Sequence, residues 1–143
     1  MEVQGRYHVD RQKLFTFLLD QFREDCRQNT GKELALSDIQ PGFSFIKSFG
    51  KNQSNQVKVT VLELESPRLY KVQLKSNRGE SLVVYEMEEQ GAETQVTYRE
   101  EMEADGRLQG LNYKLLYPFL KKRMQKQMKS RLDYLISHLK AKP

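Results

Sequence analysis

The stretch QVTYREEM, residues 95–102, alternates between apolar and polar side chains with a period of two. That period is typical of a β-strand with one buried face. Val96, Tyr98 and Met102 share one side of the predicted strand, and Glu100 lies in the same register. A sheet that is apolar on one face must bury that face against another element. The stretch therefore predicts a covered sheet and raises the question of what compensates a carboxylate on its inner side.

Five further segments, all N-terminal to this stretch, have patterns that fit strands. They are residues 3–9, 43–49, 57–64, 70–75 and 83–87. Polar turns at residues 52–56, 77–80 and 90–91 separate the later strands, which indicates an antiparallel meander. The alternation slips at Leu62 and Leu64, which predicts a β-bulge or a strand covered on both faces.

A helix is predicted near the N-terminus. Asp10 is a suitable N-cap, because its side-chain oxygen can accept a hydrogen bond from the first helical turn. The apolar spacing that follows indicates an amphipathic helix over residues 11–28, which ends near Gly31. Ser37 is expected to cap one further short turn.

The C-terminal segment carries a long apolar stripe with helical spacing. Its members are Leu116, Leu120, Met124, Met128, Leu132, Leu135, Ile136 and Leu139. Pro118 is expected either to start the main helix or to kink it. Residues 118–140 would span roughly 35 Å, enough to cross a whole sheet. The predicted fold is α+β: an antiparallel sheet of about six strands grips this helix, with one N-terminal helix and a short helical turn.

Length and composition fit one domain, residues 1–143, with 38% hydrophobic and 30% charged residues. The N-terminal residues lack the apolar core of a signal peptide, and no apolar run approaches the length of a membrane span. Cys26 is the single cysteine, and the two histidines have no metal-ligand spacing. We therefore expect a cytoplasmic protein that needs no metal or cofactor.

The net charge of +5 is concentrated at the C-terminal end, where residues 111–143 carry a charge of +8. Such a segment could bind nucleic acid or an anionic membrane surface. However, helices commonly have a charged solvent face, and aromatic residues for base stacking are absent from this one. Neither nucleic acid nor a membrane is the favoured partner.

Five segments carry a resemblance to a known group of proteins. They are NTGKEL (29–34), PGFSFIKSFG (41–50), SPRLYKVQLKSNRGESLVVYEME (66–88), VTYREEM (96–102) and KKRMQKQM (121–128). In these segments and in its layout the chain resembles the START-like superfamily (helix-grip, SRPBCC-type). More narrowly, it resembles a small bacterial family in that superfamily catalogued as a domain of unknown function.

The resemblance implies a cavity between the C-terminal helix and the sheet, which relatives use for lipids, sterols, polyketides or other apolar ligands. The candidate ligand-binding residues are Tyr98, Glu100, Arg123, Tyr85, Met102, Met124, Phe45 and Tyr70. Aromatic rings at alternating strand positions usually fill a core, but tyrosine hydroxyls need partners and methionines adapt to varied shapes. Lys47, in phase with phenylalanines, is expected near the rim with its amine in water.

Glu100 needs a partner if it points at the helix, because an unpaired buried carboxylate is unfavourable by several kcal/mol. Arg123 lies beside the apolar stripe and is the predicted partner. Three interpretations of this pair remain open: a structural ion pair, a group that orients a polar ligand head, and general acid/base catalysis by Glu100. The last would need a second convergent group, which the pattern does not supply.

The favoured function is non-enzymatic binding of a small apolar or amphipathic ligand. One alternative is a regulatory or scaffolding module that recognises a protein partner and has a solid interior. Another is binding of an anionic polymer or membrane surface by the basic helix. The oligomeric state does not follow from the sequence.

Overall fold

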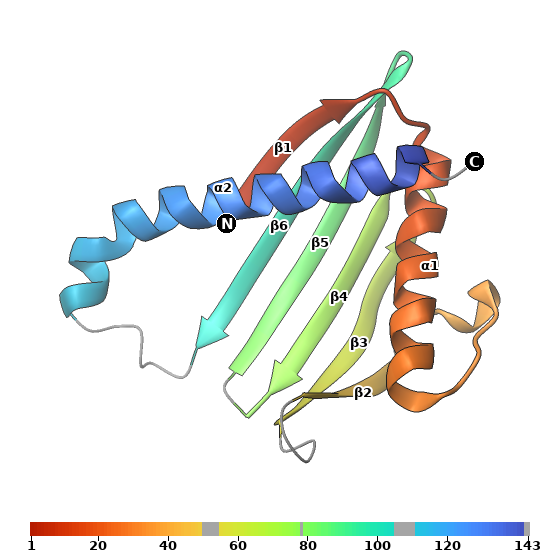
Figure 1. The fold of residues 1–143 in the computed structure, drawn as a ribbon, viewed down its shortest axis with the longest axis horizontal. Helices are drawn as coiled ribbons and strands as arrows, with labels where there is room; N and C mark the ends of the chain where they lie inside the picture. Colours follow the sequence, from red (N-terminus) through yellow and green to blue (C-terminus); the bar gives the residue numbers. More distant parts are fainter. Residues whose placement is uncertain (50–54, 78, 105–110, 142–143) are drawn as a thin grey trace.

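The computed structural model describes residues 1–49, 55–77, 79–104 and 111–141 (Figure 1). The elements are β1 (Glu2–Tyr7), α1 (Arg11–Thr30), the short 3-10 turn η1 (Leu36–Asp38), β2 (Ser44–Phe49), β3 (Asn55–Glu65), β4 (Leu69–Ser76), β5 (Gly79–Gln90), β6 (Glu93–Ala104) and α2 (Leu111–Ala141). This order confirms the prediction. Most of the predicted turn at 52–56 and the side chains of Leu116 and Leu120 lie outside the described residues.

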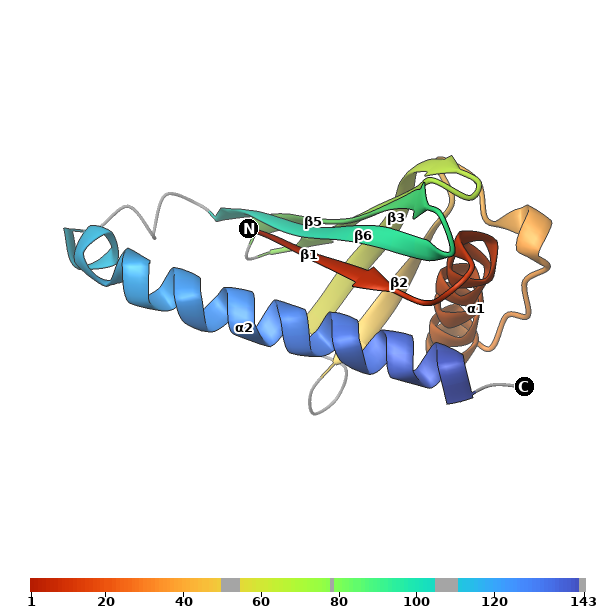
Figure 2. The same ribbon diagram turned by 90° about the horizontal axis from the view of Figure 1, so that it is seen from above.

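All six strands form one antiparallel sheet in the order β1-β6-β5-β4-β3-β2. Figure 2 shows α2 lying across one face of this sheet, with α1 beside the C-terminal end of α2. The predicted α+β class, with a sheet packed against a C-terminal helix, is therefore confirmed. No helix in the described part of the chain has the length and hydrophobicity that a membrane span requires.

The ends of α1 follow the local sequence signals. Asp10 accepts a hydrogen bond from the Lys13 backbone N–H at 3.2 Å, and Gly31 takes the left-handed conformation at φ 74°. In η1 the predicted cap is wrong: the Asp38 carboxylate, rather than Ser37, accepts from the backbone N–H of Ala35 at 2.9 Å. A carboxylate here can reach back across the turn to the N–H that opens it.

The irregularity predicted in β3 is a bulge. Val61 pairs with Val72, and the next paired residue is Glu63, so Leu62 is the extra residue. The bulge returns Leu64 to the inner face, where it packs against the core.

The core lies between the sheet and the two helices. From α2 it takes Met128, Leu132 and Ile136, each at most 3% exposed. From α1 it takes Leu14, Phe15, Leu18, Phe22 and Cys26. Helix α2 begins at Leu111, so Pro118 does not start it.

A polar cluster joins β1 to α2. The Tyr7 hydroxyl donates to Asp133 at 2.7 Å and accepts from Lys129 at 2.6 Å, and Lys129 also bonds Asp133 at 2.9 Å. The Tyr7 ring lies directly over Gly5, where an added Cβ atom would clash with the Tyr7 ring and its hydroxyl oxygen. Gly5 therefore leaves the space that this tie between strand and helix requires.

Gly5→Ala should displace the Tyr7 ring from its position over residue 5 and lower the free energy of unfolding by about 1–2 kcal/mol, because the hydrogen bonds of Tyr7 to α2 are lost. Urea denaturation measures the loss. In a Tyr7→Ala background the same substitution should be neutral or slightly stabilising, because alanine suits a strand better than glycine. An equal loss in both backgrounds would contradict this role of Gly5.

Candidate functional site

Three tyrosines form a row across the middle of the inner face. Tyr70 of β4 pairs directly with Tyr85 of β5, which pairs directly with Tyr98 of β6. Because directly opposed residues on neighbouring strands share a face, their rings meet. The Tyr85 and Tyr98 rings stack at 4.7 Å and 16°, and Tyr70 meets Tyr85 edge-on at 5.9 Å. The row forms a continuous aromatic floor beneath the helices.

Two spaces lie above this floor, and together we call them the cleft. The α1-side space has a volume of about 390 Å³, and the α2-side space has a volume of about 560 Å³. Three residues line both spaces: Gln21 of α1, Tyr85 of the sheet and Leu135 of α2. The two spaces therefore adjoin at these residues. The α2-side space therefore lies between the C-terminal helix and the sheet, where the resemblance implied a cavity, whereas the α1-side space lies mainly between α1 and the sheet.

The lining differs between the two spaces. The α1-side space has an apolar floor of Val59, Val72, Leu74 and Val83, and a polar rim of Glu24, Asp25 and Gln28. The α2-side space is bounded by Phe17 and Tyr98 and by four polar or aromatic residues of α2: Ser130, Arg131, Tyr134 and His138. Apolar surface dominates inside, and hydrogen-bonding groups lie toward the helices.

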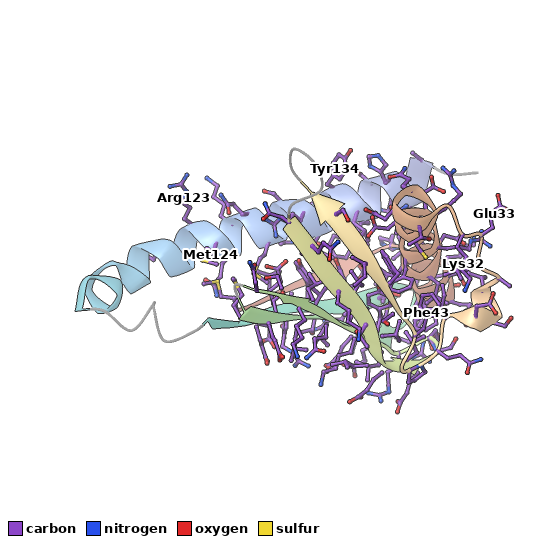
Figure 3. All side chains as sticks on the ribbon, turned by 90° about the horizontal axis from the view of Figure 1, so that it is seen from below. Lys32, Glu33, Phe43, Arg123, Met124 and Tyr134 are labelled. Atoms are coloured by element: carbon purple, nitrogen blue, oxygen red, sulfur yellow. The ribbon has the colours of Figure 1, made fainter. Side chains whose placement is uncertain are left out.

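Glu100 faces α2 as predicted, but its partner is Arg131. Arg131 donates to the Glu100 carboxylate at 3.1 Å, and the Tyr98 hydroxyl donates to the same oxygen. The predicted partner, Arg123, is exposed and points away from the sheet (Figure 3). It lies eight residues before Arg131, about 12 Å along the helix axis, and so does not reach Glu100. Helical periodicity predicts which face of α2 meets the sheet, but it does not predict which turn of α2 lies over Glu100.

The three tyrosine hydroxyls remain protonated well above neutral pH. Burial, followed by the charge of the neighbouring Glu100, raises the pKa of Tyr85 to about 12. Burial also raises the pKa of Tyr70, and burial followed by the nearby Tyr85 raises that of Tyr98. Hydrogen bonding to Tyr98 and the charge of Glu100 raise the pKa of Arg131. The cleft thus presents neutral phenols beside one ion pair.

Of the other predicted site residues, Phe45 is buried and packs edge-on against Phe22 of α1 at 5.2 Å. Met102 shares the inward register of β6 but is 66% exposed. Met124 is half-buried on the sheet side of α2 (Figure 3). The amine expected in water at Lys47 instead pairs with the Asp25 carboxylate at 2.8 Å.

Sequence reasoning missed several residues that line the cleft. They include Gln21 of α1 and Ser130, Arg131, Tyr134 and His138 of α2. A signal existed for Arg131, which directly precedes the stripe residue Leu132 and lies one turn from Met128 and Leu135. Gln21 gives no such signal, because an exposed glutamine on a helix is ordinary.

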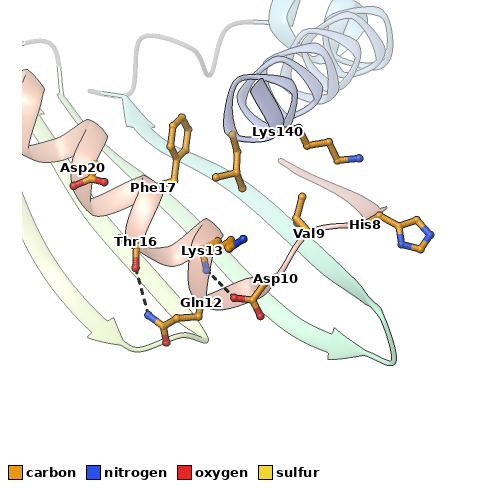
Figure 4. A pocket seen from close by; sticks show the side chains of 10 residues that line it. His8, Val9, Asp10, Gln12, Lys13, Thr16, Phe17, Asp20 and Lys140 are labelled. Carbon is orange, nitrogen blue, oxygen red and sulfur yellow. Dashed lines mark hydrogen bonds between the residues drawn. The ribbon is translucent and has the colours of Figure 1, made fainter. Parts of the chain in front are cut away.

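A third space, of about 500 Å³, lies where the β1–α1 connection meets the end of α2 (Figure 4). Phe17 lines both this space and the cleft. The rim of this third space is polar and carries both signs of charge, with Asp10, Lys13 and Lys140 among its residues. Among the described residues, no group of three or more histidine, cysteine or acidic side chains is arranged to hold a metal ion.

A family model described as "Domain of unknown function (DUF3284)" matches residues 1–121. No curated protein matches the chain in sequence. Similar solved structures include Ara h 8.0201, with 12% identity, coverage of 96% of this chain and 97% of that chain, and a TM-score of 0.59. CalU16 from Micromonospora echinospora has 14% identity, coverage of 99% and 74%, and a TM-score of 0.55. Mll3558 from Rhizobium loti has 13% identity, coverage of 90% and 91%, and a TM-score of 0.53. At these identities the similarity shows a shared fold.

The effects of removing Glu100 and Arg131 on the free energy of unfolding should be coupled by about 0.5–1 kcal/mol. The coupling should be modest because the arginine is largely exposed. The measurement is a double-mutant cycle of Glu100→Gln and Arg131→Met in urea. Arg123→Met is the matched control and should change stability by less than about 0.5 kcal/mol. Coupling of Glu100 to Arg123 instead would show that α2 crosses the sheet at a different height.

Stability should fall in alkali, because the pKa of Tyr85 is about 12 in the folded protein and near 10 when unfolded. A raised folded pKa gives stability that is complete below about pH 10 and is lost as the pH rises toward 12. Tyr85→Phe should therefore reduce the slope of unfolding free energy against pH in this window by up to about 1.4 kcal/mol per unit. An unchanged slope would mean that Tyr85 is not buried.

Proposed function

We propose that this chain, which belongs to the DUF3284 family of domains of unknown function, binds a small apolar or amphipathic molecule in the cleft formed by α1, α2 and the sheet. The observation that carries the proposal is the cleft itself. Each of its two spaces, at about 390 and 560 Å³, falls within the roughly 300–1,000 Å³ of small-molecule sites. The fold similarity and the START-like layout support the same location.

The chemistry of the walls suits a molecule with an apolar body and one polar end. Tyr70, Tyr85 and the floor valines offer apolar surface and ring faces. Arg131 and Ser130 offer hydrogen-bond donors at the α2 side. Because Glu100 already neutralises the Arg131 charge, a polar but uncharged end group is favoured over a carboxylate.

Binding is preferred to catalysis because the Glu100 carboxylate already accepts hydrogen bonds from two donors, Tyr98 and Arg131. A general acid or base would need that proton site free to exchange with a substrate. The proposal invokes no metal or cofactor. A cytoplasmic setting remains a prediction from the sequence.

The alternative, a protein-interaction module with a solid interior, is less well supported, because spaces of about 390 and 560 Å³ remain beside the packed core, on either side of Tyr85 and Leu135. Binding of an anionic polymer by the exposed Lys122, Arg123 and Lys126 predicts an affinity that falls steeply with salt. Neither alternative depends on the residues that line the cleft.

The test is a thermal-shift screen with fatty acids, sterols and flat polycyclic aromatics, together with native mass spectrometry of the purified protein. A ligand at a hundred times its Kd should add about 2.7 kcal/mol of stability. Gln21→Trp should abolish that gain, because the indole would fill the junction of the two spaces.

Gln12→Trp is the matched control, since Gln12 is an exposed glutamine of the same helix that lies outside the cleft. Binding should survive this substitution. The proposal fails if no compound binds and none copurifies, or if Gln21→Trp binds as well as the unmodified protein.

A further inference from the structure

β1 forms one edge of the sheet. It pairs with β6 on one side, and in the described part of the chain no strand pairs with its other side. Figures 1 and 2 show α2 crossing one face of the sheet and continuing past the β1 edge, while no other strand lies along the outer side of β1. An uncovered edge presents backbone donors and acceptors that can pair with another chain.

The hydrogen-bond register identifies which backbone groups face outward. Met1 and Glu100 exchange two backbone hydrogen bonds, each 2.9 Å long. In an antiparallel pair such bonds recur at every second residue, so Val3, Gly5 and Tyr7 also bond β6. The remaining residues direct their N–H and C=O groups away from the sheet. They are Glu2, Gln4 and Arg6.

The side chains of these three residues are exposed on the outer face of the sheet. Glu2 lies 3.6 Å from Arg99, but Arg6 forms no ion pair with any residue that the structure describes. The opposite edge differs, because the Asn29 side chain accepts a hydrogen bond from the Ser48 backbone N–H of β2 at 3.4 Å. Of the two sheet edges in the described part of the chain, the β1 edge is therefore the one that combines outward backbone groups with opposite charges at symmetric positions.

We propose that β1 is a self-association surface, on which β1 of a second copy of this chain pairs antiparallel about Gln4. In this register Glu2 lies opposite Arg6 of the partner subunit, and Arg6 lies opposite Glu2 of the partner subunit. The outward backbone groups fall into hydrogen-bonded pairs in the same register. The two sheets become one continuous sheet, and each unpaired arginine gains a carboxylate.

A second copy fits this edge because the sequence EVQGRY is complementary to itself when reversed about its third residue. Backbone and charge select the same register independently. A one-residue slip would place outward backbone groups opposite residues already bonded to β6, and it would misalign both charge pairs. This inference does not depend on the ligand cleft, which lies on the inner face.

Sedimentation equilibrium over about 1 to 500 μM should show a reversible dimer. Gln4→Pro should weaken it at least about tenfold, because proline removes both central backbone donors of the dimer. The Gln4 N–H faces away from β6, so the fold should persist, which circular dichroism checks. Arg6→Glu should weaken the dimer similarly, whereas Lys32→Glu, an equal charge change on an exposed residue outside β1, should not.

Cysteine cross-linking tests the register. Residues paired at the two-fold axis lie about 5.5 Å apart between Cα atoms, which suits a disulfide. Gln4→Cys should therefore give a covalent dimer under mild oxidation, and Glu2→Cys should not, since its two copies would be about 13 Å apart. A monomer at every concentration, a dimer unaffected by Gln4→Pro and Arg6→Glu, or cross-linking at Glu2→Cys alone would overturn the proposal.

Discussion

The packing of α2 across the inner face of the sheet is the interaction on which the rest of the structure depends. Met128, Leu132 and Ile136 are buried there, and they cover valines and tyrosines that would otherwise face water. The same contact brings Arg131 to Glu100 and holds Leu135 beside Tyr85. A core that closed fully over the sheet would leave no cleft. Here α1 and α2 meet the sheet at different places, so the space between them is only partly filled.

The carboxylate in the apolar register of β6 follows from this geometry. Glu100 is 25% exposed at its side chain, so it keeps some water while Arg131 and Tyr98 supply hydrogen bonds. That arrangement avoids the full cost of an unpaired buried charge. It also orders the end of the tyrosine row, because the Tyr98 hydroxyl is held in one direction. The charge is thus explained by a specific partner from the covering helix.

Sequence periodicity predicted the elements and their faces, because alternation and helical spacing depend on residues close together in the chain. The Asp10 cap, an irregularity at Leu62 and the inward side of Glu100 were all predicted from such local patterns, and the structure shows that the irregularity is a bulge. Contacts between segments that are distant in the sequence could not be predicted in this way. The register that aligns the tyrosines depends on how strands pair, and the choice of Arg131 over Arg123 depends on the height at which α2 crosses the sheet. The exposure of Met102 could not be predicted for the same reason. Its register on β6 is inward, but the elements that pack on the sheet leave its side chain largely uncovered.

An NMR titration with isotope-labelled tyrosine and leucine side chains tests the central claim most directly. The titrant is the compound that stabilises the protein most. If α2 and the sheet enclose a ligand site, the resonances of Tyr85, Tyr98 and Leu135 should shift together as the compound saturates the protein. Unchanged resonances for these three residues, with shifts confined to Leu82 on the outer face of β5, would contradict the account.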